Sequence, residues 1–257
     1  MILPIAVLQI LALSPQGAPQ VAAGNPNTDT QWEKDLAEFD VELAKRKADF
    51  ASRQISGDTK EGAKQILAHL CDLDQYMRKY FGVPFEHGYG GTPAGKKFAD
   101  AFLIRSNRVD EANLIVFKAL LARWGWFPQK EWGEEADLHG WLLVQHADND
   151  LPFQKKVLAI LEPLVKSGES DPSRFAYLYD RVAVNDRRLQ RYGTQGFCTG
   201  PGKWTPRPIE DPEHVDEKRH AVGLPPMAEY IASFGDLCKE DETKKALKWL
   251  GLPLQKP

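Results

Sequence analysis

Residues 150–168 read DLPFQKKVLAILEPLVKSG and contain the signals that decide the predicted fold. Asp150 can cap the amino end of a helix, and Pro152 fits the first turn, where no backbone N–H is needed. Gly168 is a typical residue to end the same helix. The stretch therefore predicts one short helix whose start and stop are both marked in the sequence.

The same pairing of aspartate with proline recurs further along the chain. Asp171 precedes Pro172 in DPSRFAYLYDRVAVND, and Asp211 precedes Pro212 before EHVDEKRHAVG. Short helical segments joined by short turns, with few β-branched runs, indicate an α-helical domain. The predicted fold is mainly α: a compact bundle of short helices paired as hairpins, with a Pro/Gly-rich loop region and an N-terminal helical arm.

Two further helical segments are predicted before this domain. WEKDLAEFDVELAKRKADFASRQ, residues 32–54, is charged and only loosely periodic, which is typical of an arm. TKEGAKQILAHLCDLDQYMRKYFG, residues 59–82, carries apolar residues at helical spacing and ends at Gly82 and Pro84. The next stretch, VPFEHGYGGTPAG, lacks the spacing of a phosphate-binding loop, so it is interpreted as a connector.

The composition limits the possible partners. The chain has 257 residues, 42% of them hydrophobic and 27% charged, which is ordinary for a globular protein. Its 33 basic and 36 acidic residues nearly balance, whereas a nucleic-acid-binding protein normally carries a basic stripe. Beyond the N-terminus, no segment approaches the roughly 20 apolar residues that cross a bilayer. We therefore expect no nucleic-acid partner and no membrane span once the N-terminal segment is removed.

Residues 1–23 are typical of a signal peptide. MILPIAVLQILAL is almost wholly apolar, and Val21 and Ala23 are placed for cleavage after Ala23. No lysine or arginine precedes the apolar run, so either the signal is weak or the true start lies upstream; an ordinary N-terminal helix is the alternative. The expected location is the periplasm or the extracellular medium. The expected domains are the signal peptide at 1–23, a linker and helical region at 24–122 and an α-helical domain at 123–257.

The three cysteines, Cys71, Cys198 and Cys238, match no metal-binding spacing. In an oxidising compartment Cys198 and Cys238 could pair. A buried free thiol is the alternative for each of the three. The sequence therefore predicts neither a metal nor another cofactor.

The stretch WLLVQHADND begins like a buried helix face and ends in polar side chains. Gln145 falls on the same face as Leu138 and Trp141, and His146 lies at its edge. A buried amide and a buried imidazole both need hydrogen-bond partners, because unpaired polar groups in a core cost free energy. Asp148 and Asp150, at the end of the helix, could fix the imidazole or cap the next helix.

Two further polar motifs follow this stretch. In AYLYDRV, Asp180 and Arg181 are adjacent, so they point to different sides of a helix and each needs a partner elsewhere. In LQRYGTQGF, Gly193 allows a tight turn. The polar side chains around that turn are Gln190, Tyr192, Thr194 and Gln195. The next stretch, residues 198–212, is rich in proline and is predicted to be a stiff irregular loop.

These motifs, together with PIEDPEHVDEKRHAVGLPPMAEY, resemble a family of bacterial domains of unknown function. Its signature is Q-H-A-D, a D-R pair and Q-x-Y-G-T-Q, in this order, followed by a proline-rich segment. The resemblance spans about Trp124 to Tyr230 and implies that the C-terminal half is the family domain. It implies no activity, substrate or cofactor.

Three hypotheses about the polar motifs stay open. The favoured one is a binding site for a small polar ligand, or a peptide or sugar fragment, formed by the polar residues of all three motifs. In a hydrolase or transferase, His146 would be the general acid or base, oriented by Asp180 or Asp148, and Arg181 would hold an anionic group. Alternatively, the same residues form a purely structural network. The oligomeric state does not follow from the sequence.

Overall fold

The computed structural model describes residues 30–200, 202–235 and 238. The predicted signal peptide lies outside these residues. The mainly α prediction is confirmed: helices dominate the described residues, in which the strands form a single two-stranded sheet. Chain contacts divide the protein into two compact units, one ending at His146 and one running from Ala147 onward. We call them the N-terminal unit and the C-terminal unit and describe each by itself.

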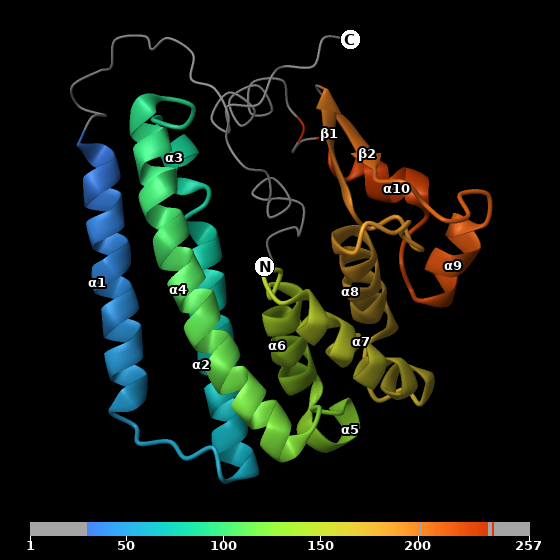
Figure 1. Ribbon diagram of the computed structural model, residues 1–257, viewed down its shortest axis with the longest axis horizontal. Coiled ribbons are helices and arrows are strands. Elements are labelled where there is room, and N and C mark those ends of the chain that lie inside the picture. The colour runs from blue at the N-terminus through green and yellow to red at the C-terminus, as the bar shows by residue number, and fades with distance from the viewer. Residues whose placement is uncertain (1–29, 201, 236–237, 239–257) are drawn as a thin grey trace. The chain divides into compact units, whose positions relative to one another are not determined.

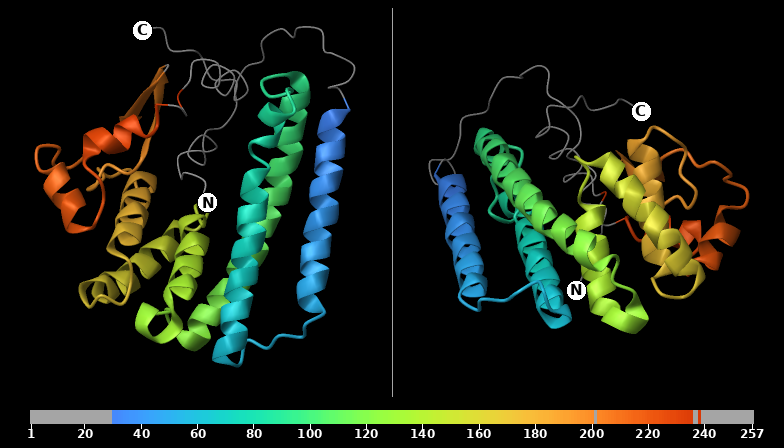
Figure 2. Two further views of the ribbon diagram at one scale, coloured as in Figure 1. Left: turned by 180° about the vertical axis from the view of Figure 1, so that it is seen from behind. Right: turned by 60° about the horizontal axis from the view of Figure 1, so that its bottom comes forward.

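The N-terminal unit is helical. Its helices are α1 (Gln31–Ala51), α2 (Lys60–Lys79), α3 (Val83–Glu86), α4 (Pro93–Trp124), α5 (Gln129–Trp132) and α6 (Glu134–Gln145). Figure 1 and both views of Figure 2 show α1, α2 and α4 running side by side. The predicted N-terminal arm is α1, and it packs along α4 and α2.

An aromatic core joins α1 to α2 and α4. Phe39 of α1 is fully buried, and its ring lies edge-on to Tyr80 and Phe102 at centroid distances of 4.9 and 5.1 Å. Leu36, one turn earlier, is buried in the same cluster. Burying a phenylalanine side chain contributes about 1.5–3 kcal/mol. The arm is therefore part of the folded unit, although its sequence is only loosely periodic.

The start of α4 is determined by local contacts. The Thr92 hydroxyl accepts a hydrogen bond from the Gly95 N–H at 3.3 Å, and Pro93 occupies the first turn. A Cβ on Gly95 would lie 2.5 Å from the Tyr89 carbonyl oxygen, so this position admits only glycine without a backbone shift. The sequence predicts short helices, and α4, with 32 residues, is a long exception.

The C-terminal unit combines helices with a hairpin. Its elements are α7 (Leu151–Lys166), α8 (Pro172–Asn185), β1 (Gly196–Gly200), β2 (Lys203–Pro206), α9 (Val215–Ala221) and α10 (Met227–Ala232). As predicted, the Asp150 carboxylate caps α7 and the Asp171 carboxylate caps α8. The helix start predicted at Asp211 and Pro212 was wrong, because α9 begins later. The Asp211 carboxylate accepts a hydrogen bond from Lys218 instead of capping the helix.

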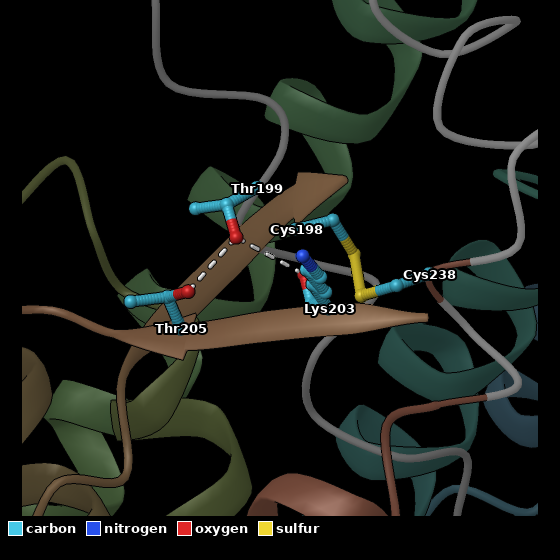
Figure 3. The surroundings of a disulfide bond; sticks show 5 residues. All are labelled: Cys198, Thr199, Lys203, Thr205 and Cys238. Atoms are coloured by element: carbon cyan, nitrogen blue, oxygen red, sulfur yellow. Dashed lines mark hydrogen bonds between the residues drawn. A yellow bond between two sulfur atoms is a disulfide. The ribbon is translucent and has the colours of Figure 1, made fainter. Parts of the chain in front are cut away.

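The proline-rich stretch predicted as an irregular loop contains most of the antiparallel β1–β2 hairpin, with Phe197 opposite Thr205. The Thr199 and Thr205 hydroxyls lie 2.9 Å apart across it, and a disulfide joins Cys198 to Cys238 (Figure 3). Tertiary packing explains why the sequence pattern did not indicate strands. The buried Trp204 of β2 stacks on Phe234 at 4.6 Å, so this strand is held from outside the sheet.

Among the residues that the structure describes, no helix combines the length and the apolar character that a membrane crossing requires. The long α4 carries charged side chains throughout, including Lys96, Arg105 and Asp110.

Candidate functional site

His146 lies directly after α6 and contacts a carboxylate of α2. Its N–H donates to the Leu142 carbonyl at 3.1 Å, which continues the helical hydrogen bonding of α6. Its Nδ1 lies 2.9 Å from both carboxylate oxygens of Asp74. The side chains of His146 and Asp74 are only 5% and 2% exposed. The two residues therefore form a buried histidine–carboxylate pair inside the N-terminal unit.

Two more charged residues extend this pair. Nη2 of Arg78 donates to Oδ1 of Asp74 and to Oδ1 of Asp110, both at 3.0 Å. Arg78 follows Asp74 by one turn of α2, whereas Asp110 comes from α4. Buried charges are stable in proteins only when they are paired and hydrogen-bonded. The four side chains meet this condition by alternating in sign, and their charges cancel when the imidazole is protonated.

The contacts assign the proton of the neutral imidazole to Nδ1. Nε of Arg78 also lies near Nδ1 of His146, at 3.4 Å, but a nitrogen that accepts from arginine cannot donate to a carboxylate. The two contacts with Asp74 are shorter and involve an anion, so Nδ1 is the donor to Asp74. Nε2 is then the basic nitrogen of the ring.

The neighbouring charged groups determine the pKa of Asp74. Burial by itself raises the pKa of this carboxyl group. The positive charges of His146 and Arg78 and the hydrogen bond from His146 outweigh burial, so the pKa falls below its usual 3.8. Asp74 therefore remains ionised near neutral pH and keeps the imidazole in one orientation.

The sequence predicts Asp148 or Asp180 as the residue that orients His146, whereas Asp74 makes this contact in the structure. A signal for Asp74 was present, because an acidic residue interrupts the apolar stripe of α2 at a position that faces the core. That stripe consists of Leu67, Leu70, Asp74 and Met77, spaced three or four residues apart. A carboxylate at such a position must find a partner across the helix packing.

A second histidine–carboxylate pair lies elsewhere in the N-terminal unit. Nδ1 of His87 lies 2.9 Å from Oδ2 of Asp35, which also accepts a hydrogen bond from the Tyr89 hydroxyl at 2.6 Å. The Asp35 side chain is buried, but that of His87 is 43% exposed. This pair ties the segment predicted as a connector to α1, and it provides a natural comparison for His146.

In the C-terminal unit, the structure joins two of the predicted ligand-binding residues. Nε of Arg181 donates to Oδ1 of Asp148 at 2.7 Å, and its Nη2 donates to the other oxygen. The Asn185 amide donates to the same carboxylate at 3.2 Å. Arg181 is buried, whereas the Asp148 side chain is 44% exposed. The aspartate of the Q-H-A-D motif and the arginine of the D-R motif therefore form an ion pair.

Asp180, the other residue of the D-R motif, is fully buried and organises the Q-x-Y-G-T-Q turn. Its carboxylate accepts hydrogen bonds from the N–H groups of Arg191 (2.7 Å), Tyr192 (3.0 Å) and Thr194 (2.8 Å). The Thr194 hydroxyl adds a fourth hydrogen bond at 3.0 Å. Burial raises the pKa of Asp180, and these hydrogen bonds reduce that rise without cancelling it.

The glutamines of this turn bind the backbone. Nε2 of Gln190 donates to the carbonyls of Gln195 (2.9 Å) and Arg207 (2.6 Å), and its Oε1 accepts the Gln195 N–H at 2.9 Å. Nε2 of Gln195 donates to the Thr194 hydroxyl at 3.0 Å. These polar groups are therefore engaged in closing the turn.

Arg219 is a buried residue of this region that the sequence analysis did not single out. Its Nη1 donates to the Tyr192 carbonyl and its Nε to the Pro225 carbonyl, both at 2.6 Å. The guanidinium also lies over the Tyr230 ring, 4.5 Å from its centroid. Arg219 follows the buried Val215 by four residues, about one helical turn. This spacing was the available signal that Arg219 faces the core.

Neither a metal centre nor an activated thiol is found among the described residues. No three histidine, cysteine, aspartate or glutamate side chains gather there in a way that could hold a metal ion. The free Cys71 is buried, and burial raises the pKa of its thiol to about 12. A thiol with this pKa is protonated at neutral pH and is a poor nucleophile.

Comparison with protein-family models shows that a family of unknown function, DUF6624, matches residues 62–239. The chain belongs to this family. The match confirms the resemblance and begins well before Trp124, so Asp74, Arg78 and Asp110 lie inside the DUF6624 segment, whereas α1 lies outside it. Comparisons with curated proteins and with solved structures found no match.

We predict that Asp180→Asn destabilises the protein. The amide offers one acceptor oxygen where the carboxylate has two, so at least one buried N–H of the turn loses its partner. The expected loss in the free energy of unfolding is about 1–3 kcal/mol. Chemical denaturation measures it, with Asp49→Asn on the exposed face of α1 as the surface control. Equal stability of Asp180→Asn and the parent would contradict the role assigned to this carboxylate.

We predict that Asp74→Asn changes how stability depends on pH. Because folding lowers the pKa of Asp74, its contribution is complete above the unfolded value of 3.8 and is lost as the pH falls through the lower folded value. Breaking the buried pair should cost about 3–5 kcal/mol at neutral pH. Urea titrations at several pH values should therefore show parent and variant converging in acid. A constant difference down to about pH 2 would refute the prediction.

Proposed function

We propose that this protein is an exported member of the DUF6624 family that binds a small polar ligand through His146. The observation that carries the proposal is the buried contact of Nδ1 with both oxygens of Asp74, at 2.9 Å. This contact fixes the ring, and in the proposal Nε2 is the ring atom that meets a hydroxyl or N–H group of the ligand. Sugar and peptide fragments offer such groups.

The energetic cost of the charged cluster supports a functional role. Replacing a buried ion pair by well-packed apolar residues is often neutral for stability, so the need for a stable fold does not by itself explain the charged cluster of Asp74, Arg78 and Asp110. A carboxylate with a lowered pKa, held next to a histidine as Asp74 is, is a candidate for a functional site. The network around Asp180 differs, since its hydrogen bonds go to the backbone that it folds.

We therefore propose a smaller set of ligand contacts than the sequence predicts. The proposal places the ligand contact at His146 and keeps the neighbouring Gln145 as a second ligand-binding residue. Asp148, with its partly exposed carboxylate, is kept as a separate ligand-binding candidate of the C-terminal unit. Gln190, Thr194 and Gln195 act structurally in this proposal, because their polar groups bind one another and the backbone.

A second candidate function is catalysis of a hydrolytic or group-transfer reaction. It is favoured by the same contact, because a carboxylate on Nδ1 is the arrangement in which imidazole Nε2 serves as a general base. His146 would take a proton from water or from a substrate hydroxyl and return it to the leaving group. Asp74 would be the positioning residue and would stay ionised throughout.

Export is supported by two independent features. The apolar residues 1–23 have the pattern of a signal peptide, and the chain carries a disulfide between Cys198 and Cys238. Disulfides persist in the periplasm and outside the cell but are rare in the reducing cytosol. A compartment outside the cytosol agrees with both features.

We predict that His146→Asn separates ligand binding from folding. Asparagine places an N–H close to the position of Nδ1, so the contact with Asp74 is retained, but it has no counterpart of Nε2. The variant should keep most of the parent's stability and lose the ligand-induced rise in unfolding temperature. The measurement is a thermal-shift screen with monosaccharides, disaccharides, N-acetylated amino sugars, dipeptides and tripeptides. A ligand at one hundred times its Kd adds about 2.7 kcal/mol to stability.

His87→Asn is the comparison variant, because Nδ1 of His87 also lies 2.9 Å from an aspartate oxygen, Oδ2 of Asp35, and the substitution should leave ligand binding unchanged. If a ligand is found, its chromogenic ester or glycoside tests catalysis, and loss of the general base should reduce the rate by about 10²–10⁴-fold. A ligand that stabilises the parent and His146→Asn equally would refute the proposed contact. Loss of stability in His146→Asn, with no ligand found for the parent, would favour the structural alternative.

We predict that the chain expressed with its own N-terminus is processed and oxidised outside the cytosol of a bacterial host. The processed protein should begin at Gly24, because the predicted cleavage follows Ala23. N-terminal sequencing and thiol titration of the denatured protein check both points, with Cys198→Ser as the control that frees Cys238. A full-length, fully reduced protein in the cytosol would contradict the export proposal.

A further inference from the structure

One face of α4 exposes large aliphatic side chains. Ile104 is 56% exposed and Ile115 is 72% exposed. The opposite face of the same helix is buried against the rest of the N-terminal unit through Phe102, Val109, Asn113 and Phe117. An exposed isoleucine is ordinary on its own, but these two lie three helical turns apart and therefore point in nearly the same direction.

Two oppositely charged residues lie between the isoleucines. Positions 104, 108, 111 and 115 are spaced by four, three and four residues, so they form one stripe along the helix. Arg108 and Glu111 are both exposed. Neither forms an ion pair within the part of the chain that the structure describes. We call Ile104, Arg108, Glu111 and Ile115 the α4 face.

The α4 face is complementary to itself. Its order is isoleucine, arginine, glutamate and isoleucine, and it is centred between Val109 and Asp110. When a second α4 is laid against the first in the antiparallel direction with these centres aligned, position 104 meets position 115 and position 108 meets position 111. Each isoleucine then packs on an isoleucine, and each arginine meets a glutamate.

We infer that the α4 face binds a second copy of this chain, with the two α4 helices antiparallel about a two-fold axis. A two-fold interface uses the same patch on both copies, so every contact occurs twice. The symmetric charge order favours a second copy over an unrelated protein, which would need no such symmetry. A lipid surface is disfavoured, because it would select basic residues at the edges of the face and not a central glutamate.

The size of the face indicates a weak dimer. Stable interfaces bury about 1,200–2,000 Å² in total, and a single helix pair lies at or below the lower end of that range. Micromolar dissociation constants are typical of such contacts. The dimer should therefore appear as the concentration of the full-length chain increases.

Sedimentation velocity of the full-length chain, from about 1 to about 500 µM, tests the inference by charge reversal. Arg108→Glu places two glutamates at each charged contact, and Glu111→Arg places two arginines there. Each single variant should raise the dimer dissociation constant at least about tenfold, because like charges oppose association. The double variant Arg108→Glu/Glu111→Arg restores opposite charges and should return the constant to within about threefold of the parent.

An apolar substitution provides a matched comparison. Ile115→Ser removes a side chain from the α4 face, whereas Val41→Ser removes one from α1 that is exposed to a similar extent, 70% against 72%. Only Ile115→Ser should weaken the dimer. Unfolding temperatures of all variants should stay within a few degrees of the parent, because every substituted side chain is exposed, and this shows that they are folded.

Cysteine cross-linking tests the antiparallel register. Mixing Ile104→Cys with Ile115→Cys under a mild oxidant should yield a disulfide-linked dimer, and each variant by itself should yield much less. The buried Cys71 is common to all samples and does not distinguish them. A parent that remains monomeric at the highest concentration would overturn the inference. So would association that the α4 variants leave unchanged, including association through the apolar N-terminal segment, or equal cross-linking in mixed and unmixed samples.

Discussion

A carboxylate taken out of water must be hydrogen-bonded or paired, and the C-terminal unit is built around the way Asp180 meets that requirement. Three backbone N–H groups and one hydroxyl of the following turn converge on it. The same turn also provides carbonyl acceptors. The Thr194 carbonyl accepts a hydrogen bond from the Tyr230 hydroxyl, and the Tyr192 carbonyl accepts one from Arg219. One buried side chain of α8 thereby organises the turn, and through it the segments that contain α9 and α10.

In the N-terminal unit the buried carboxylate of Asp74 is stabilised in a different way from that of Asp180. The difference distinguishes a carboxylate that can serve chemistry from one that serves folding. Asp74 is surrounded by the side chains of His146 and Arg78, which can carry positive charge, whereas Asp180 is surrounded by neutral donors. The pKa is accordingly lowered at Asp74 and raised at Asp180. A carboxylate that stays ionised next to an imidazole can hold a base in place, whereas one that accepts four neutral hydrogen bonds mainly fixes a backbone. Because of this contrast, the proposed ligand contact lies at His146.

The local features of the fold could be predicted, because neighbouring residues determine them. The Asp150 and Asp171 caps and the packing of α7 with α8 follow from capping chemistry and helical spacing. The β1–β2 hairpin could not be predicted in the same way, since its stability comes from Trp204 packing on Phe234 and from the disulfide. Asp74 was not identified as the partner of His146 because the two residues are 72 positions apart in the sequence.

The sequence by itself determined that the protein is mainly helical, where several helices begin and end, and which polar residues required partners. Helical periodicity and capping act over a few residues, so they can be recognised without coordinates. Only the tertiary structure decided which partners these residues have: Asp74 for His146, Asp148 for Arg181 and the Q-x-Y-G-T-Q turn for Asp180. The physical reason is that a buried polar group specifies only that it needs a counterpart. Which counterpart it meets depends on how the helices pack.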